Sequence, residues 1–148
     1  MRHALLIILF LPLVLCGCVT GYTSRIELPS EITTLSTNTD SIKNETGTTL
    51  STLNFHSVPE KNFWPVYPGM VAEWKLTKER GFWLGGCTIT VALSVEQDLI
   101  VVTINCGDTE SRKEVRKIQD ILQKAMADKF PTLKIRVIAA YDITAMPP

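Results

Sequence analysis

Apolar and polar residues alternate along three stretches in the C-terminal half of the chain. The stretches cover residues 70–77, 87–95 and 99–106. Strict alternation is the pattern of a β-strand with one buried face, so each stretch predicts a strand. In the first, the residues expected to face inward are Met70, Ala72, Trp74 and Leu76. Phe82-Trp83-Leu84 is interpreted as the beginning of the second strand, and Gly85-Gly86 indicates a bulge within it.

The second and third stretches predict an antiparallel hairpin. Folding them about Glu96-Gln97 makes the large inward residues face one another, in the pairs Leu93 with Ile100, Val91 with Val102 and Ile89 with Ile104. The same register puts Cys87 opposite Cys106, so we predict a disulfide between them. A slip of one residue would turn one strand's apolar set away from the core. The bond would stabilise the fold by about 3 kcal/mol.

A helix and a final strand follow the hairpin. Ser111 and Glu114 form a capping box, and the helix is expected to continue to about Lys129. Its apolar stripe consists of Val115, Ile118, Ile121, Leu122, Ala125, Met126 and Phe130. Residues 133–143 predict the last strand. The order β-β-β-α-β indicates one two-layer α+β domain over residues 63–148, with a mainly antiparallel four-stranded sheet and one helix. A curled half-barrel is the alternative.

Residues 18–62 have the composition of a flexible tether. Between Thr33 and Thr52, 11 of 20 residues are Ser or Thr and none is aromatic. Leu35, Ile42 and Leu50 are too scattered to show a helical or strand period. Such a segment is not expected to bury enough apolar surface to offset the entropy of ordering it. An edge strand is the alternative.

The first 18 residues have the features of an export signal. Arg2 and His3 precede an apolar run of 12 residues, Ala4–Leu15, which is shorter than the roughly 20 that a membrane-spanning helix needs. The sequence Leu15-Cys16-Gly17-Cys18 then resembles a bacterial lipobox, although Cys16 departs from its usual pattern. An ordinary secretory signal and an uncleaved anchor are the alternatives.

The lipobox resemblance implies a specific maturation. Residues 1–17 would be the signal peptide, cut after Gly17, and Cys18 would carry the lipid, including a palmitate or similar acyl chain on its new N-terminus. In this family an Asp after the lipidated Cys favours retention in the inner membrane. Val19 stands there, so the resemblance implies a lipoprotein of the outer membrane with its domain in the periplasm.

Charge and cysteine content narrow the classes of partner. The chain has 15 basic and 15 acidic residues, and removal of Arg2 with the signal leaves a formal net charge of −1. This argues against a nucleic-acid partner. Cys87 and Cys106 are the only cysteines after Cys18, and His56 is the only histidine left, so we expect neither metal nor cofactor. We also expect no enzyme, because no positioned nucleophile and base are evident.

Aromatic and basic residues are the candidates for a partner surface. Aromatic side chains and arginines are enriched in protein interfaces. The candidates are Trp64, Tyr67, Trp74, Trp83, Arg112 and Arg116. For the aromatics the simpler interpretation is a core role, and for the helix cations it is a solvated face. An acidic partner or lipid headgroups at the Arg112–Lys117 end are the alternative.

The sequence therefore favours a binding or assembly role for an anchored protein. An anchor, a long tether and a small disulfide-bonded domain resemble the layout of envelope accessory lipoproteins, among them the pilotins. That resemblance implies an envelope protein as the partner, docked along a sheet edge or in a groove between helix and sheet. The alternative function is an exclusion or inhibitor lipoprotein that acts against phage, conjugation or host lysozyme.

Overall fold

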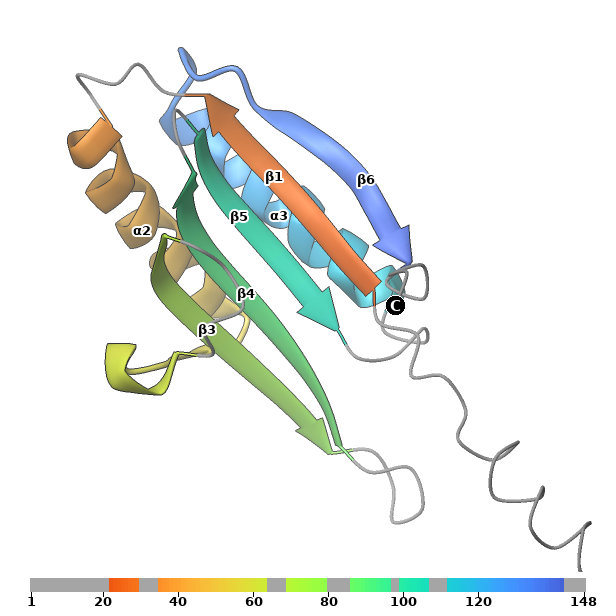
Figure 1. The fold of residues 1–148 in the computed structure, drawn as a ribbon. Coiled ribbons are helices and arrows are strands. Elements are labelled where there is room, and N and C mark those ends of the chain that lie inside the picture. The colour runs from red at the N-terminus through yellow and green to blue at the C-terminus, as the bar shows by residue number, and fades with distance from the viewer. Residues whose placement is uncertain are drawn as a thin grey trace, which may run out of the picture.

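The computed structural model describes residues 22–29, 35–63, 69–79, 86–96, 99–106 and 112–142. The elements in chain order are β1 (Tyr22–Pro29), α2 (Leu35–Thr52), β2 (His56–Ser57), the short 3-10 helix η2 (Glu60–Asn62), β3 (Met70–Glu79), β4 (Gly86–Glu96), β5 (Leu99–Cys106), α3 (Arg112–Lys129) and β6 (Arg136–Asp142). Figure 1 shows one sheet with α2 and α3 behind it.

All neighbouring strands in the sheet are antiparallel, and their order is β2-β3-β4-β5-β1-β6. The predicted α+β class is confirmed, and the predicted strands and helix of the C-terminal half correspond to β3 to β6 and α3. The predicted counts are wrong, because the described residues form six strands and two helices rather than four and one. The additional elements come from the segment that was expected to be a tether.

β1 overturns the prediction of a flexible tether and the domain boundary at residue 63. This strand lies inside the sheet, where it pairs with β5 on one side and β6 on the other. Its side chains alternate, and those of Tyr22, Ser24, Ile26 and Leu28 are buried. The whole-segment composition concealed this because eight alternating residues precede the Ser/Thr-rich part. The domain therefore includes residue 22 onward.

α2 forms in the Ser/Thr-rich part itself. Ile42, Thr46 and Leu50 are fully buried and four residues apart, so they lie on one face of the helix. An ideal Cβ at Gly47 would be 3.5 Å from the ring of Trp74, so the helix backbone approaches the indole closely. The stripe was missed because its middle member is a threonine. Tertiary packing, rather than helix propensity, accounts for this helix.

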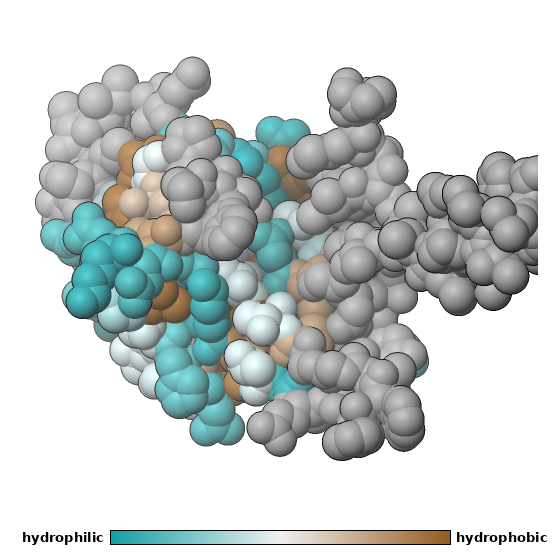
Figure 2. All heavy atoms as spheres, turned by 60° about the horizontal axis from the view of Figure 1, so that its bottom comes forward, coloured by the Kyte–Doolittle hydropathy of each residue, from teal (hydrophilic) through white to brown (hydrophobic). Residues whose placement is uncertain are grey.

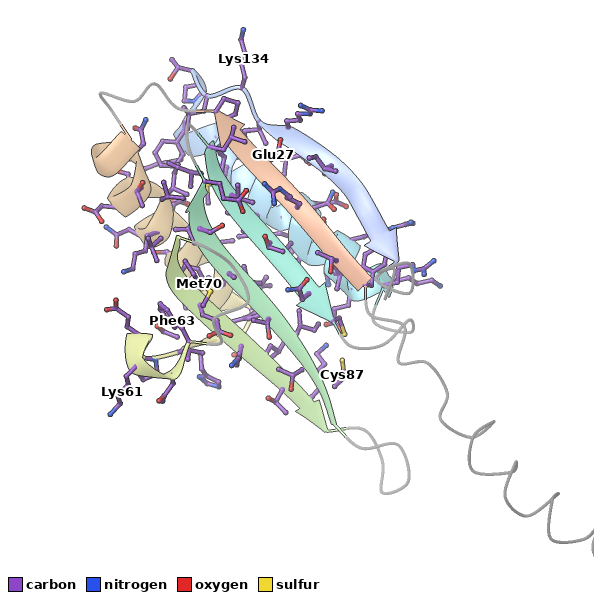
Figure 3. All side chains as sticks on the ribbon, in the orientation of Figure 1. Glu27, Lys61, Phe63, Met70, Cys87 and Lys134 are labelled. Carbon is purple, nitrogen blue, oxygen red and sulfur yellow. The ribbon has the colours of Figure 1, made fainter. Side chains whose placement is uncertain are left out.

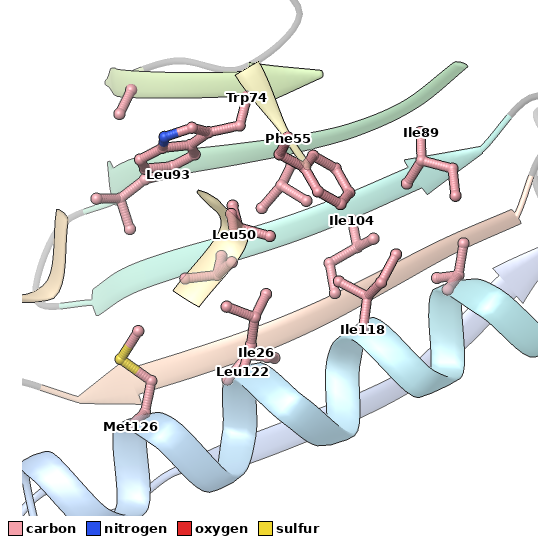
Figure 4. Close-up of a cluster of buried hydrophobic side chains, with 14 of the residues drawn as sticks. Ile26, Leu50, Phe55, Trp74, Ile89, Leu93, Ile104, Ile118, Leu122 and Met126 are labelled. Carbon is pink, nitrogen blue, oxygen red and sulfur yellow. The ribbon is translucent and has the colours of Figure 1, made fainter. Parts of the chain in front are cut away.

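α3 supplies most of the helical contribution to the core. Val115, Ile118, Leu122 and Met126 are buried, which confirms the centre of the predicted stripe. Figure 4 shows Ile118, Leu122 and Met126 pointing from α3 toward the sheet, where Ile26 and Ile104 lie. α2 closes the other part of the same face, and Leu50, Phe55 and Trp74 meet there (Figure 4). The helices therefore share one core with the sheet.

The hairpin of β4 and β5 differs from the prediction by two residues. Cys106 pairs with Ile89, and Val91 pairs with Ile104. Only residues 97 and 98 connect the strands, and such a tight connection determines the register. A shift of two residues keeps every side chain on the same face, so the hydrophobic pattern does not distinguish the two registers. Cys87 is therefore a diagonal neighbour of Cys106 rather than its direct partner.

β6 returns beside β1 after the α3 crossover. β5 and β6 are both antiparallel to β1, so they run parallel to one another with β1 between them. The sheet is open, with β2 and β6 as its edges. At one end of the sheet, β1 begins, β5 and β6 end, and α3 begins (Figure 1). We call this the Tyr22 end.

Candidate functional site

A groove of about 180 Å³ opens between the end of α2, β3 and α3. It is lined by Leu53, Asn54, Phe55, Leu76, Lys78, Glu114, Lys117, Ile118 and Ile121. Five of these side chains are aliphatic or aromatic, and the charged ones come from β3 and α3. An apolar groove with a few polar groups is the usual form of a binding site in a small domain.

The end of α2 forms one wall of this groove. The helix ends at Thr52, and Asn54 then takes a left-handed backbone conformation with φ 63°. Asparagine adopts this conformation more readily than most residues. The Phe55 N–H donates to the Leu50 carbonyl at 3.1 Å. The turn thereby directs Phe55 into the core, where its side chain is buried.

Charged groups surround the opening of the groove. Lys78 Nζ donates a hydrogen bond to Glu114 Oε1, which links β3 to α3. Lys117 lies on the same helix and is exposed. The Lys78–Glu114 pair is neutral as a whole, so Lys117 gives this opening a net positive charge. An apolar segment that carries an acidic residue would match both the groove and its margin.

The edge of β3 beside the groove is open. β2 covers β3 only at Lys75 and Trp74, which pair with His56 and Ser57. Within the described residues, no strand pairs with residues 76–79 on that side. The Val58 N–H donates to the Glu73 carbonyl at 2.8 Å, and antiparallel bonding alternates. The backbone N–H and C=O of Thr77 therefore point toward the open edge.

The edge and the groove form one continuous surface. Leu76 and Lys78 point to the same face of the sheet as the buried Trp74, because residues two apart on a strand share a face. Both line the groove. A strand added beyond β2 would therefore bond to Thr77 and direct every second side chain into the groove.

The opposite face of the sheet carries an ion-pair cluster. Arg25 bonds to Glu27 through Nε at 3.0 Å and to Glu96 through Nη2 at 2.5 Å. Val101 pairs with Glu27 and with Ser94, so the Arg25–Glu96 pair crosses above Val101, which is fully buried. Burial lowers the pKa of Arg25, but Glu96 and Glu27 raise it by more, and the net shift is upward. The pair closes this part of the face.

The rest of the sheet face opposite the helices is neither mainly hydrophobic nor mainly hydrophilic. Figure 2 brings the lower end of Figure 1 forward, and its described surface mixes hydrophilic, intermediate and hydrophobic residues. Glu73 is buried beneath it and pairs with Lys75 at 3.0 Å. In this tilted view the visible hydrophobic residues lie among hydrophilic and intermediate ones. The groove is therefore a better candidate for a partner site than this face.

Arg112 and Arg116 lie together at the Tyr22 end. The Arg112 guanidinium lies over the Tyr22 ring, 5.0 Å from its centroid. Arg116 Nε donates to the Tyr22 hydroxyl at 3.1 Å, and this bond raises the pKa of Arg116. The side chain of Arg116 is exposed. The structure thus places both predicted basic residues beside the first residue of β1.

Of the four aromatic candidates for a partner surface, the structure describes Trp74. The prediction that Trp74 is part of a partner surface is wrong, because its side chain is 6% exposed and packs against α2 in the core. A substitution there would destabilise the domain rather than report on binding. Trp64, Tyr67, Trp83 and the proposed lipidation site Cys18 all lie outside the described residues. Among the aromatic candidates that the structure describes, Trp74 does not line the groove.

Cys87 and Cys106 are in contact but are not bonded in the structure. Their Sγ atoms are 2.8 Å apart, whereas an S–S bond is about 2.05 Å long. Both side chains are buried. Cys106 pairs with Tyr22, and Figure 3 shows Cys87 toward the same end of the sheet. The predicted disulfide is not formed in the structure, and the predicted pairing of Cys87 directly opposite Cys106 is wrong.

The sequence suggested a groove between helix and sheet as one possible docking place, but it did not identify the residues that line it. Leu53 and Phe55 were assigned to the tether, although the spacing of Leu50, Leu53 and Phe55 is dense enough to indicate the end of a packed element. Ile121 was assigned to the apolar stripe of α3, but it is only partly buried and lines the groove. The available signal was the width of the apolar stripe of α3, because the stripe contains more apolar residues than the core buries.

Three further findings bound the site. In the described ranges, no group of three or more His, Cys, Asp or Glu residues could hold a metal ion. No helix of the described part is long and apolar enough to cross a membrane. No protein-family model matches this chain, and no curated protein matches it either.

Proposed function

We propose that this protein is a lipid-anchored envelope protein that binds a segment of another envelope protein in the groove between α2, β3 and α3. The observation that carries the binding role is the continuity of the groove with the open edge of β3. Strand addition to an exposed edge supplies backbone hydrogen bonds, and pockets for alternate side chains supply specificity. Thr77 offers the backbone groups, and Leu76 marks the adjoining groove wall.

The chemistry of the groove indicates the character of the segment. Leu53, Phe55 and Ile121 favour apolar side chains at every second position of an extended strand. Lys117 favours an acidic residue next to them, since the Lys78–Glu114 pair is already neutralised. We therefore propose an extended segment with alternating apolar residues and at least one carboxylate.

The anchor rests on the resemblance of Leu15-Cys16-Gly17-Cys18 to a lipobox. We propose Cys18 as the lipidated residue and the outer membrane as the location. The comparison with pilotins included a long tether, and β1 and α2 occupy most of that segment. The accessory role is retained in this proposal, but the binding domain lies close to the anchor.

A pair of photo-crosslinking positions tests the binding role. The crosslinker is placed in the full-length protein in its native cells, at Lys117 beside the groove or at Lys124 as the control. Both lysines are exposed on α3, and only Lys117 lines the groove. We expect one native envelope protein to be captured from position 117 and not from 124. Equal capture from both positions would contradict the groove as the site.

A backbone substitution tests strand addition separately. Thr77→Pro removes an N–H that bonds to nothing within the sheet, and proline is tolerated on edge strands. We expect the capture from position 117 to be lost while the thermal unfolding temperature stays close to that of the wild type. Thr90→Pro on the internal strand β4 is the control, because Thr90 pairs with Lys75 on one side and Asn105 on the other, and it should unfold the domain. Full capture by folded Thr77→Pro would exclude strand addition.

The alternative function predicts a different partner. An exclusion or inhibitor lipoprotein would give no native capture from position 117. It would give capture only after phage, donor cells or lysozyme are added. The positive margin of the groove does not favour lysozyme, which is a cationic protein, so the assembly role is the better supported of the two.

A further inference from the structure

β1 begins four positions after Cys18, the residue that we propose carries the lipid. Consecutive Cα atoms are 3.8 Å apart, so the Cα of Tyr22 lies within about 15 Å of the Cα of Cys18 by any path of the chain. This limit is far shorter than the span of the tether that composition suggested. A lipid on Cys18 therefore holds the Tyr22 end of the sheet next to the bilayer.

Cations are concentrated at this same end. Arg112, Lys113, Arg116 and Lys117 occur within the first six residues of α3. Glu114 is the acidic residue among them and is already paired with Lys78. Lys113, Arg116 and Lys117 are exposed, and Arg112 and Arg116 both contact Tyr22. The basic cluster is thus joined directly to the residue that the anchor holds near the bilayer.

The far part of α3 lacks this excess. Asp120 and Asp128 alternate there with Lys124 and Lys129, and all four side chains are exposed. The charge of the helix is therefore asymmetric along its axis. Attraction between basic side chains and anionic lipids extends over about one Debye length, roughly 8 to 10 Å in physiological salt. Only the Tyr22 end is brought within that range.

We propose that the basic cluster at the start of α3 binds the anionic phospholipid headgroups of the membrane that holds the anchor. This proposal rests on the lipid anchor of the proposed function and adds an orientation to it. One or two acyl chains combined with a basic patch form a stronger membrane attachment than the chains alone. The groove residues Lys78 and Lys117 lie toward the same end, so a bound partner segment would be contacted beside the bilayer.

Two lysines on one helix provide the test. Lys113 and Lys129 are both exposed on α3 and are about 24 Å apart along its axis. A photo-crosslinker replaces one or the other in the full-length lipidated protein. The purified protein is reconstituted into vesicles of phosphatidylglycerol and phosphatidylethanolamine, and lipid adducts are counted by mass spectrometry. The measurement includes the effect of Asp108 and Glu110, which precede α3 and lie outside the described residues.

We expect roughly tenfold more phosphatidylglycerol adduct from position 113 than from position 129. Replacing phosphatidylglycerol with phosphatidylcholine, or raising the salt concentration to about 0.5 M, should lower the yield at position 113 several-fold. Equal yields at the two positions, or none at position 113 in protein that floats with the vesicles, would overturn the orientation alone. If the intact mass shows no acyl chains and the protein does not float with the vesicles, the protein has no lipid anchor and this proposal is wrong. The crosslinking test of the groove would still be valid in that case.

Discussion

At the scale of single residues, Thr46 is the unusual member of the buried stripe of α2. Its side chain is fully buried, and its hydroxyl has no hydrogen-bond partner among the residues that the structure describes. An unsatisfied buried hydroxyl costs about 1 to 3 kcal/mol. Valine has the same shape and a similar helix propensity, so it would fill this position without that cost.

We therefore expect Thr46→Val to raise the free energy of unfolding by about 1 kcal/mol. Chemical denaturation monitored by circular dichroism measures this change. Thr48→Val is the control, because Thr48 is exposed on the same helix and the substitution should change stability by less than about 0.5 kcal/mol. A loss of stability in Thr46→Val would show that the hydroxyl has a partner in solution.

Cys87 and Cys106 make a second residue-scale prediction. Their sulfur atoms are in contact and 19 positions apart in sequence, and a protein exported as we propose would form disulfides readily. We expect protein from the native envelope to be two hydrogens lighter than the reduced protein, and the difference to disappear in Cys106→Ala. Oxidation should add about 3 kcal/mol to stability. Two alkylatable thiols in freshly denatured envelope protein would contradict this prediction.

At the scale of elements, β1 distinguishes a domain strand from a tether. Ile26 is fully buried between the sheet and α3 (Figure 4). We expect Ile26→Ala to lower the free energy of unfolding by about 2 to 5 kcal/mol, because it leaves a cavity in the core. Urea denaturation measures the change. Lys43→Ala, at an exposed position of α2, should alter stability by less than about 0.5 kcal/mol. A negligible effect of Ile26→Ala would indicate that residues 22–29 are a flexible tether and not a strand of the core.

The elements with the most regular spacing of apolar residues were the ones that could be predicted from the sequence. β3, β4, β5 and α3 have long alternating or helical patterns of strongly apolar residues, and sequence reasoning located all four. α2 has only Ile42 and Leu50 as buried apolar members of its stripe, so its pattern is visible only when Thr46 is counted as buried. β1 is short and stands next to a low-complexity segment, whose composition dominated the interpretation.

At the scale of the whole molecule, the proposed lipid anchor would decide where the domain lies. Metabolic labelling with palmitate, followed by intact mass measurement, tests it. We expect Cys18→Ala to abolish labelling and Cys16→Ala to leave it unchanged, since Gly17 is the small residue that precedes the proposed cut. If Cys16→Ala alone loses the label, the lipidated residue is Cys16 and not Cys18. Labelling in neither parent nor variant would exclude the anchor.

The residues that line the groove could not be predicted from the sequence, because its walls are far apart along the chain. Phe55 comes from the end of α2, Leu76 from β3 and Ile121 from α3. Each of these residues has an ordinary core explanation when it is considered alone. Their meeting around one opening depends on where β2 begins, and this depends on the turn at Asn54.

The sequence by itself determined the α+β class, the C-terminal strands and helix, and the candidate lipid site, because these depend on local periodicity or on a short contiguous motif. Only the tertiary structure decided that residues 22–29 pair inside the sheet, that the hairpin register is shifted by two residues, and that Trp74 is buried. These features depend on contacts between distant segments. A strand's pattern shows which face is buried, but the neighbouring elements decide what covers that face and which edge remains open.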